Sequence, residues 1–459
     1  MFTEWTARLP EIVVRLCRMI RQSQGRAWLV GGCVRDLCLG RTPKDFDIEV
    51  FGLNEARLCE LASRFGKVLP VGKSFGILKL RTESHEIDLA LPRTEVKKAP
   101  GHSGFDVQPD PHLDEHTASL RRDFTINAMM YDPVECRLLD PHNGYRDLQR
   151  GLLRHVSPAF AEDPLRVLRG MQFAARFQLK LDSETATLCR MLLEEAQTLS
   201  RPRIWQEWRK WALAPYPSFG LRLLQDSGWV ELYPELHALI GCPQSPRWHP
   251  EGDVWIHTCQ AVDKAASIAR REHLDEEHTL ILVFSELCHD LGKPQTTINE
   301  NGNLRSPGHS EAAQPLIIAF AERIGMPKRL LPYIRPLVSE HMCHLHGQPT
   351  QRAVRRLSHR LSPATIELWE MLVEADASGR HPAPPSRPAL PWLELARQMK
   401  QHRSKPEPIV TGQMLIELGM MPGPKMGQLL RRAYQAQLDG QFSDKREARE
   451  WCQHELNKG

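Results

Sequence analysis

Leu29–Val50 has the sequence LVGGCVRDLCLGRTPKDFDIEV, which decides the fold of the N-terminal part of the chain. It predicts a strand that runs through two glycines into a short helix, followed by a second strand. Gly31 and Gly32 let the backbone approach a phosphate closely, and the helix behind them offers unpaired N–H groups to an anion. Arg35 lies one turn into this helix and is a candidate contact for a triphosphate. The alternative is a plain tight turn between a strand and a helix.

The second strand of this stretch carries a pair of carboxylates. Asp45 and Asp47 stand at positions i and i+2, so both side chains lie on one strand face. Mg²⁺ prefers hard oxygen ligands, and in nucleotidyl transfer such ions activate a 3′-hydroxyl and neutralise the departing pyrophosphate. Asp88 is a candidate third carboxylate from a neighbouring strand, and an ion pair with Arg93 is the alternative reading of Asp88.

The hydrophobic pattern changes along the chain. Up to about Asp140, short β-rich runs alternate with turns and helical segments, and the runs are Ala27–Val30, Phe46–Val50, Gly76–Leu80 and Glu86–Leu91. After Asp163, apolar positions recur at helical spacing nearly to the end. The fold class predicted from this change is an α+β head with a mixed sheet, followed by an all-α body.

The glycine turn and the carboxylate pair carry a family resemblance. The pattern G-G-x-x-R-D followed by D-F-D resembles the first signature of the nucleotidyltransferase superfamily that includes DNA polymerase β. More narrowly, it is similar to the bacterial-type (class II) tRNA nucleotidyltransferases, the CCA-adding enzymes, and to their poly(A) polymerase relatives. The resemblance implies a polymerase-β-like mixed sheet, Mg²⁺ as cofactor, and tRNA, CTP and ATP as partners.

A second motif extends the resemblance. Arg121–Met129 has the sequence RRDFTINAM, which matches the second motif of the same family almost letter for letter. In that family the arginine and aspartate at the positions of Arg122 and Asp123 bind the triphosphate and ribose, and Asn127 helps to hold the pocket. Without the resemblance, Asp123 would be interpreted as the cap of a helix start beside salt-linked arginines.

The stretch Ser157–Arg169, SPAFAEDPLRVLR, is the most specific segment of the chain. Asp163 suits an N-cap and Pro164 the first helical position, which places Arg166 one turn on, beside the Asp163 side chain. Such a buried pair imitates a complementary base edge, because the aspartate accepts from an exocyclic amino group and the arginine donates to a ring nitrogen. Cytosine and adenine offer that order, whereas guanine and uracil do not. A plain salt bridge at a helix start is the alternative.

This segment resembles the E-D-x-x-R motif of the same family. The family's role in base selection carries to Asp163 and Arg166, and Arg169 matches a further nucleotide contact. The chain departs from the family at Gln172, where related bacterial enzymes often have an arginine, and this puts one phosphate contact in doubt. Thr94–Glu115 corresponds to a flexible loop that in CCA-adding relatives helps the pocket switch from C to A.

Several activities remain open from the sequence. The long Thr94–Glu115 segment favours a full CCA-adding enzyme over a CC-only relative, and A-only addition is a further possibility. Val71–Gly76 lacks the arginine-rich continuation associated with poly(A) polymerases, the nearest rival. Two rivals from other classes are a protein that is chiefly a phosphohydrolase and a non-catalytic RNA-binding protein.

A second set of chemical residues lies in the predicted helical body. His257 precedes the adjacent pair His289 and Asp290, and Asp376 follows them. The pattern resembles the HD-domain phosphohydrolases, in which these four positions bind a divalent metal that activates water against phosphate esters.

Two more histidines belong to this resemblance. His309 and His341 match additional histidines of HD-bearing CCA enzymes, although in a chain with 20 histidines a single one is more often a surface or core residue. The resemblance implies a divalent transition metal such as Ni²⁺ or Mn²⁺ and a secondary phosphatase or 2′,3′-cyclic phosphodiesterase activity. A degenerate domain without catalysis is the alternative.

At 459 residues the chain is too long for one compact core. We predict a nucleotidyltransferase head at 1–140, a helical neck with the base-recognition motif at 141–235, an HD domain at 236–380 and a helical tail at 392–459. The proline-rich run Pro382–Pro391 is the predicted linker before the tail. Gly427–Arg432 in the tail is a candidate grip on the tRNA elbow, with plain packing as the alternative.

Composition limits the partners and the compartment. The formal net charge is +4, with basic clusters such as Arg201–Lys210 that permit the binding of a polyanion. No segment approaches the roughly 18 unbroken apolar residues of a membrane span. The 11 scattered cysteines lack a C-x-x-C pair, which suits reduced thiols. We therefore expect a cytoplasmic protein without a membrane partner, and the sequence leaves open whether it is a monomer or a homodimer.

Overall fold

The structure is a computed structural model that describes residues 2–71, 77–97, 105–380, 382–383 and 387–457. The chain forms two compact units. The first contains Met1–Glu207 and Phe219–Leu232, and the second contains Trp208–Ser218 and Tyr233–Gly459.

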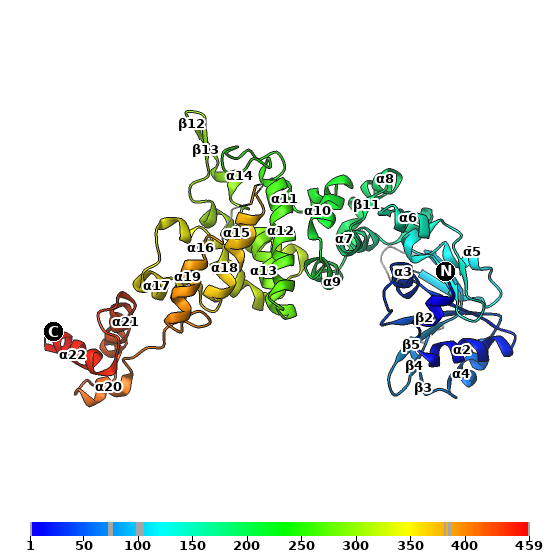
Figure 1. Ribbon diagram of the computed structural model, residues 1–459, viewed down its shortest axis with the longest axis horizontal. Helices are drawn as coiled ribbons and strands as arrows, with labels where there is room; N and C mark the ends of the chain where they lie inside the picture. The colour runs from blue at the N-terminus through cyan, green and yellow to red at the C-terminus, as the bar shows by residue number, and fades with distance from the viewer. Residues whose placement is uncertain (1, 72–76, 98–104, 381, 384–386, 458–459) are drawn as a thin grey trace. The chain divides into compact units, whose positions relative to one another are not determined.

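A seven-stranded sheet forms the base of the first unit, in the order β3-β4-β5-β2-β1-β8-β9 (Figure 1). Its strands are β1 (Arg26–Val30), β2 (Phe46–Phe51), β3 (Lys67–Val71), β4 (Ile77–Arg81), β5 (Glu86–Ala90), β8 (Met130–Asp132) and β9 (Arg137–Leu139). Only β2 and β5 pair in parallel, while the other neighbours run antiparallel. The predicted mixed sheet is therefore confirmed, and the four strands predicted from the sequence lie within it.

Helices pack against the sheet, and one of them begins at the glycine turn. The first residues form α1 (Thr3–Thr6) and α2 (Glu11–Gln22), which are separated at Pro10, whose ψ is 139°. Helix α2 buries Val13, Leu16 and Ile20 and packs against α4 (Glu55–Ala62). The glycine turn leads into α3 (Gly32–Cys38), which contacts β1. This arrangement holds the turn at the edge of the buried core.

The predicted loop Thr94–Glu115 is only partly described. Its two described arms are the antiparallel strands β6 (Arg93–Lys97) and β7 (Phe105–Pro109), and residues 98–104 lie outside the described residues. Residues 72–76, which belong to the segment Val71–Gly76 that argued against a poly(A) polymerase, also lie outside them.

The remaining elements of the first unit are α5 (Glu115–Ser119), η1 (Thr125–Asn127), α6 (Gly144–Gln149), β10 (Leu152–Leu153), η2 (Pro158–Glu162), α7 (Leu165–Phe177), β11 (Lys180–Leu181), α8 (Ser183–Met191), η3 (Glu194–Thr198) and η4 (Trp229–Leu232). Helices α9 (Arg201–Ala212) and α10 (Pro217–Asp226) each have residues in both units.

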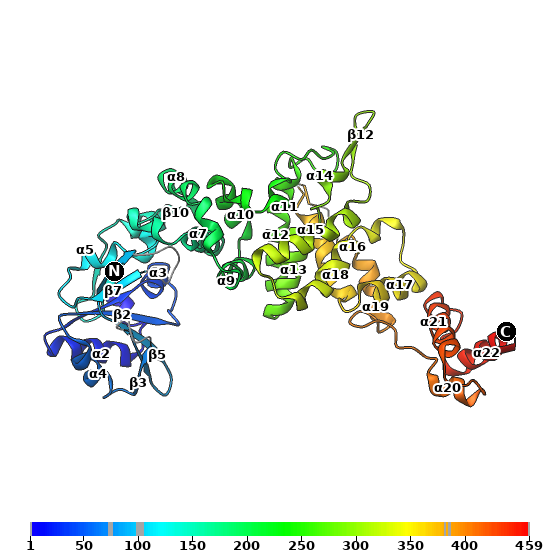
Figure 2. The ribbon, with the colours of Figure 1, turned by 180° about the vertical axis from the view of Figure 1, so that it is seen from behind.

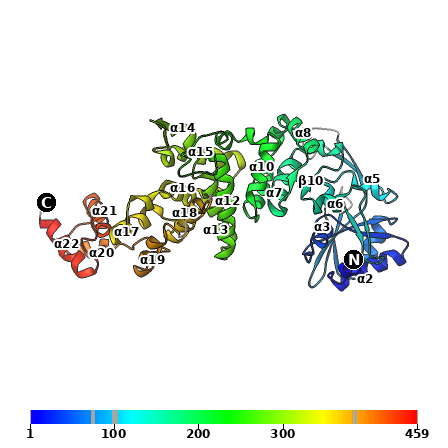
Figure 3. The same cartoon turned by 45° about the horizontal axis from the view of Figure 1, so that its top comes forward.

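The second unit is a bundle of helices. The helices α12 (Val254–Arg271), α13 (Glu276–Cys288) and α18 (Ile366–Ser378) lie side by side (Figures 1 to 3). The others are α11 (Pro234–His237), α14 (Lys293–Thr296), α15 (His309–Ile324), η5 (Lys328–Leu330), α16 (Leu331–Glu340), η6 (Cys343–His346), α17 (Gln351–Leu361), α19 (Leu390–Gln398), α20 (Gly412–Glu417), α21 (Pro424–Asp439) and α22 (Lys445–Asn457). Helix α13 is apolar nearly all round and is buried from Leu280 to Cys288, as expected for a central helix.

The body departs from the all-α prediction at two places. Strands β10 and β11 form a short parallel pair, and β12 (Ile298–Glu300) and β13 (Asn303–Arg305) form an antiparallel hairpin that projects from the helices in Figure 2. The hairpin turns at Asn301 and Gly302, whose φ values are 52° and 87°. An Asn-Gly pair is the turn that favours a two-residue hairpin, so the sequence contained this signal.

Three further findings bear on the sequence predictions. The helices α20, α21 and α22 share an apolar cluster that includes Leu415, Leu429, Ala433 and Cys452. All 11 cysteines are free, in agreement with the predicted reduced thiols. No helix within the described ranges combines the length and the apolar character that crossing a bilayer requires. The residues 384–386 of the predicted linker lie outside the description.

Candidate functional site

Two of the three predicted carboxylates face each other across the parallel strands. Asp47 on β2 stands directly opposite Asp88 on β5. Asp45 lies just before β2 and is exposed. Burial raises the pKa of Asp47, and the negative charges of Asp88 and Asp45 add to that rise, while Arg122 opposes it. The same negative field would attract a divalent cation.

The carboxylates have oxygen atoms to offer such an ion. Oδ1 of Asp88 is buried without a hydrogen-bond partner, and it pairs with Nζ of Lys79 at 3.6 Å. The carboxylate oxygens of Asp45, Asp47 and Asp88 do not all lie within 4.8 Å of one another. Like charges repel at that distance without a cation between them. The all-oxygen donor set fits Mg²⁺, and the ligation itself stays a prediction.

The glycine turn brings the backbone against these charges. Gly31 has φ 71° and ψ −133°, a region that essentially only glycine adopts. A Cβ atom at this position would lie 3.6 Å from Oδ2 of Asp47 and 3.7 Å from Nη1 of Arg122. Gly32 begins α3 directly behind it. The first predicted signature and the second motif therefore meet at Gly31.

We expect Gly31→Ala to destabilise the protein by about 1–3 kcal/mol, because alanine must hold a backbone conformation that side chains disfavour. The added methyl group also narrows the space between Asp47 and Arg122, so the KM for a nucleoside triphosphate should rise. Urea unfolding and steady-state kinetics measure the two effects. Gly427→Ala is the matched control, since its Cβ meets nothing nearer than 3.9 Å and it lies inside a helix. Equal behaviour of the two variants would contradict the role given to Gly31.

Glu49 is a site residue that the sequence analysis missed. Its side chain is fully buried and accepts hydrogen bonds from Arg121 at 2.7 Å and Arg122 at 3.1 Å. Burial acts to raise the pKa of Glu49, but the two arginines outweigh it and hold this pKa below its ordinary value. The available signal was strand alternation, which puts Asp45, Asp47 and Glu49 on one face. Glu49 thus fixes the direction of Arg122 beside Asp47.

Asp123 links the second motif to the third. Its Oδ1 accepts from the backbone N of Phe124 at 2.8 Å and from Nδ2 of Asn127 at 3.1 Å. Its Oδ2 accepts from Nε of Arg169 at 2.8 Å and pairs with Nη2 at 2.7 Å. Burial acts to raise the pKa of Asp123, but Arg169 and Asn127 hold it below the ordinary value. The alternative of a helix cap at Asp123 is wrong, because η1 begins after Phe124.

Arg35 lies deeper than the sequence suggested. The residue is 4% exposed, and its Nη1 donates to Oδ1 of Asn127 at 2.6 Å while Nη2 pairs with Asp36 at 3.1 Å. Its guanidinium also lies 4.4 Å from the ring centroid of Phe177. These contacts make Arg35 a positioning residue for Asn127, and a direct contact with a triphosphate stays a prediction.

The structure does not form the expected pair of Asp163 and Arg166. Oδ1 of Asp163 accepts from the backbone N of Leu165 at 3.1 Å, and Oδ2 pairs instead with Arg203 at 2.8 Å. Arg166 donates to the carbonyl oxygens of Ala159 at 2.6 Å and Arg121 at 2.9 Å. The alternative of a plain salt bridge between Asp163 and Arg166 is therefore wrong, because backbone carbonyl oxygens accept from the arginine and Arg203 of α9 pairs with the aspartate. Their role in base selection stays a prediction.

Gln172, where the chain differs from related bacterial enzymes, is buried. Gln172 is 1% exposed, and its Oε1 accepts from Nη1 of Arg176, one turn further along α7, at 3.3 Å. Arg176 lies 5.0 Å from the ring centroid of Phe177, beside the guanidinium of Arg35. The chain therefore lacks an arginine at position 172 but has one, Arg176, one turn further along the same helix.

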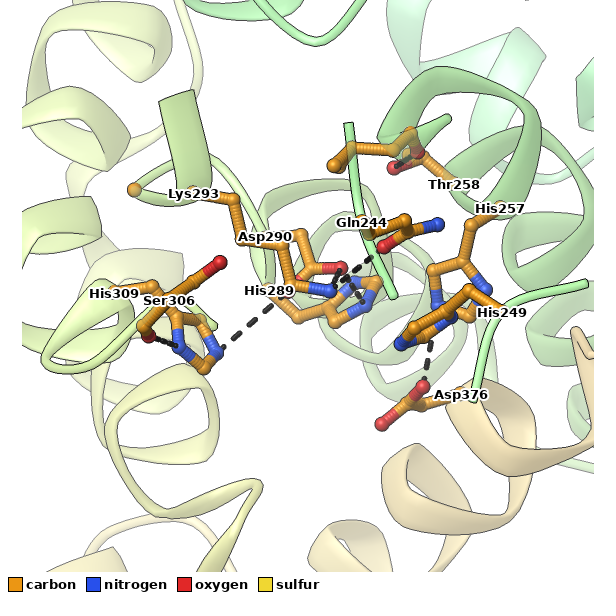
Figure 4. Close-up of polar contacts among 12 residues, drawn as sticks. Gln244, His249, His257, Thr258, His289, Asp290, Lys293, Ser306, His309 and Asp376 are labelled. Carbon is orange, nitrogen blue, oxygen red and sulfur yellow. Dashed lines mark hydrogen bonds and ion pairs between the residues drawn. The ribbon is translucent and has the colours of Figure 1, made fainter. Parts of the chain in front are cut away.

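In the second unit, the six predicted metal-binding residues come together. They lie in two groups of ligand atoms within 4.8 Å of one another and one ion pair: His257 with His289 and Asp290, Asp290 with His309 and His341, and Asp376 with His257. Figure 4 shows the imidazoles of His257, His289 and His309 turned toward the carboxylates. Nε2 of His257 lies 3.2 Å from Asp376, and Nε2 of His289 lies 3.1 Å from Asp290. His257 lies on α12, His309 on α15 and Asp376 on α18, while His289 and Asp290 directly follow α13 and His341 directly follows α16.

The protonation of three imidazoles is set by backbone oxygens. Nδ1 of His289 lies 2.6 Å from the carbonyl oxygen of Glu286, Nδ1 of His309 lies 2.8 Å from that of Ser306, and Nδ1 of His341 lies 2.7 Å from that of Val338. A carbonyl only accepts, so each Nδ1 carries the hydrogen and each Nε2 keeps its lone pair for a metal. Nε2 of His257, Nε2 of His289 and Oδ2 of Asp290 are buried and lack a hydrogen bond. These atoms fit a divalent cation of the kind that nitrogen and oxygen ligands share.

Several residues behind this cluster were not predicted from the sequence. Oε1 of Glu251 lies 2.9 Å from Nδ1 of both His249 and His257, so it orients the first predicted ligand. Nζ of Lys293 pairs with Asp290 at 2.7 Å and donates to Gln244 at 3.0 Å. Burial raises the pKa of Glu286 to about 8. Glu251 precedes α12 in an irregular segment, where helical spacing gives no signal.

Known proteins resemble this chain in the N-terminal head and over most of its length. A family model described as the poly A polymerase head domain matches residues 27–154. A multifunctional CCA protein of Nitrosococcus oceani is 37% identical over 361 residues, which cover 77% of this chain and 84% of the relative. Another, from Neisseria meningitidis serogroup B, is 34% identical over 429 residues, which cover 90% of this chain and 99% of the relative.

Solved structures share the fold over nearly the whole chain. The CCA-adding enzyme of Bacillus stearothermophilus, in complex with CTP, has a TM-score of 0.65 at 20% identity and covers 98% of each chain. The CCA-adding enzyme of Thermotoga maritima, complexed with tRNA, has a TM-score of 0.58 at 21% identity and covers 99% of this chain and 98% of the other. At this identity the likeness concerns the fold. The predicted fold class of a nucleotidyltransferase head and a helical body is confirmed.

Proposed function

This chain belongs to the family of the multifunctional CCA proteins, and from that premise we propose that it adds C, C and A in turn to the 3′ end of tRNA. The substrates are CTP and ATP, and pyrophosphate is released. The observation that carries the proposal is the meeting of Asp47, Asp88 and Arg122 at the glycine turn of Gly31. Carboxylates that suit a cation and a guanidinium that suits a phosphate both lie beside this turn, which supports the proposal.

The chain's own residues divide the work of the transfer. Asp45, Asp47 and Asp88 would hold Mg²⁺, which when bound supplies charge neutralisation for the triphosphate and lowers the pKa of the attacking hydroxyl. Arg122, held by Glu49, is directed at the phosphates. Asp123, Arg169 and Asn127 form one hydrogen-bonded unit that shapes the ribose side of the pocket, with Gly31 and Gly32 at its wall.

In this proposal base choice rests on Asp163 and Arg166, although their side chains do not pair with each other. Two of the five N–H groups of Arg166 are held by backbone carbonyls, which fixes its plane and leaves the others for a ring nitrogen. Oδ2 of Asp163 faces Arg203 and would exchange that partner for an exocyclic amino group. Cytosine and adenine satisfy both groups, while uracil and guanine leave a buried donor or acceptor unpaired.

Asp163→Asn tests this account of base choice. Asparagine offers a donor beside its acceptor, so it pairs with the carbonyl of uracil, and the preference for CTP over UTP should fall about tenfold or more. The ratio of kcat/KM for the two triphosphates on a truncated tRNA measures the preference. Asp182→Asn, a helix cap on α8, is the control that keeps the parent ratio. An unchanged ratio in Asp163→Asn would remove Asp163 from base selection.

The rival activities give different products from the same reaction. A poly(A) polymerase makes long A tails from ATP alone, a CC-only enzyme stops before A, and an A-only enzyme requires an acceptor that already ends in CC. Sequencing the products made from truncated tRNA with CTP and ATP together separates these cases. The CCA proposal expects products that end in CCA and no longer.

We further propose that the cluster of His257, His289, Asp290 and Asp376, extended by His309 and His341, binds a divalent transition metal such as Ni²⁺ or Mn²⁺ and hydrolyses phosphate esters. The proposal is supported by the three buried ligand atoms that lack a hydrogen bond and by the three imidazoles whose Nδ1 atoms face backbone oxygens. The metal when bound would make water nucleophilic. In a 2′,3′-cyclic phosphate, water adds across one P–O bond and gives a monoester and a free hydroxyl.

The remaining sequence predictions belong to this proposal. A head at 1–140, a neck at 141–235, an HD domain at 236–380 and a tail at 392–459 describe how the two activities are distributed. A cytoplasmic location fits an enzyme that acts on tRNA with CTP and ATP. Gel filtration with light scattering would decide between monomer and homodimer.

A further inference from the structure

A basic pocket opens beside the HD cluster in the second unit. It has a volume of about 720 Å³, and its lining includes Lys293, His309, Arg247, Arg305 and Arg380. None of the described residues that line it is acidic. Two of these cations pair with carboxylates of the HD cluster: Lys293 with Asp290 at 2.7 Å, and Arg380 with Asp376 at 3.5 Å. A pocket with this charge suits an anion held next to the metal-binding residues.

One rim of the pocket is aromatic. Trp248 lines the pocket and is 58% exposed, while the other ten of the 11 tryptophans, all of which the structure describes, are buried or half-buried. Leu345 lines the same pocket and is 62% exposed. Large apolar side chains that stay exposed together at a functional pocket mark a surface that a ligand covers.

The position of Trp248 is set by its surroundings. The backbone N atoms of Trp248 and His249 donate to the carbonyl oxygen of Ser245 at 3.1 Å and 2.8 Å, which holds the turn. The guanidinium of Arg247 lies 5.0 Å from the indole centroid, where it covers part of the ring. His249, the next residue, is tied through Glu251 to His257 of the cluster. The indole is therefore fixed to the same segment that orients a metal ligand.

We infer that Trp248 stacks on the nucleobase of the phosphate ester that enters the HD pocket and so makes this site specific for nucleotides over other phosphate esters. The inference rests on the proposed phosphohydrolase function and adds its specificity-determining residue. A nucleotide matches the pocket in each part: a flat base for the indole, a phosphate for the basic lining, and a scissile P–O bond for the cluster. Base stacking on an aromatic side chain tolerates any base, so the site should prefer nucleotides without selecting one base.

The test compares ligands with and without a base. Binding of adenosine 2′-phosphate and of methyl ribofuranoside 2-phosphate to the full-length, Mn²⁺-loaded protein is measured by calorimetry for the parent, Trp248→Ala and Trp248→Phe. We expect Trp248→Ala to weaken the adenosine ligand relative to the methyl riboside by about tenfold, and Trp248→Phe to retain most of the preference. Ile298→Ala, another exposed apolar residue of this unit outside the pocket lining, should keep the parent ratio.

Each outcome decides the inference. An equal loss for both ligands in Trp248→Ala would make Trp248 a structural residue, and an unchanged ratio would remove it from recognition, so either result overturns the inference. Hydrolysis of adenosine 2′,3′-cyclic phosphate is followed in parallel. Absence of hydrolysis in the parent would contradict the proposed phosphohydrolase while the binding ratio still judges the base platform.

Discussion

Asp47→Asn is expected to lower the rate of nucleotide addition by at least about 10³-fold, because it removes a carboxylate from the centre of the proposed metal site. The same change should not destabilise the protein. Since burial raises the pKa of Asp47, its ionised form opposes folding at neutral pH, and asparagine removes that cost. Single-turnover incorporation of CMP into truncated tRNA measures the rate, and thermal unfolding measures the stability.

Asp132→Asn is the matched control for this prediction. Asp132 lies on β8 of the same sheet and pairs with Arg21 at 3.4 Å, away from the glycine turn. It should keep nearly the parent rate. If Asp47→Asn retained a rate within tenfold of the parent, the transfer chemistry would have to reside elsewhere. Loss of rate together with loss of folding would contradict the stability argument.

His289→Asn is expected to abolish phosphate ester hydrolysis and to weaken binding of Ni²⁺ or Mn²⁺ by at least about 100-fold. It removes an Nε2 atom that is buried without a hydrogen bond beside Asp290. Because the carboxylates for nucleotide addition lie in the other unit, CMP incorporation should stay near the parent value. Metal content after dialysis, together with hydrolysis of adenosine 2′,3′-cyclic phosphate, checks the expectation.

The control for this change lies on α13, the helix that His289 directly follows. His278 is exposed on α13 and pairs with Asp275 at 2.8 Å, so His278→Asn should leave metal content and hydrolysis unchanged. Full metal binding by His289→Asn would contradict the ligand assignment. A protein in which both activities fall together would contradict the separation of the two chemistries between the units.

Local pattern predicted four of the seven strands of the sheet and the glycine turn, because these features depend on neighbouring residues. Gly31 is an example, since its φ of 71° follows from the strand-to-helix turn in which it lies. The pairing of Asp47 with Asp88 needed strand order, and strand alternation only made it possible. The hairpin at Asn301 and Gly302 was missed although its turn signal is local.

Contacts between distant segments were the main source of error. Helical spacing placed Arg166 one turn beyond Asp163, but spacing cannot reveal that Arg203 of α9 reaches the same aspartate. In the same way, no periodicity marks Glu251 as the partner of His257, because it lies in an irregular segment before α12. The cluster of histidines was predicted by family resemblance, and its tautomers came only from the backbone oxygens around it.

The most direct measurement of the central claim is a series of single-nucleotide incorporations on three acceptors: tRNA ending in the discriminator base, in C and in CC. The account predicts that the first and second acceptors take up CTP and the third takes up ATP, with neither UTP nor GTP used on any of them. Uptake of UTP, or a long A ladder on the first acceptor from ATP alone, would contradict it.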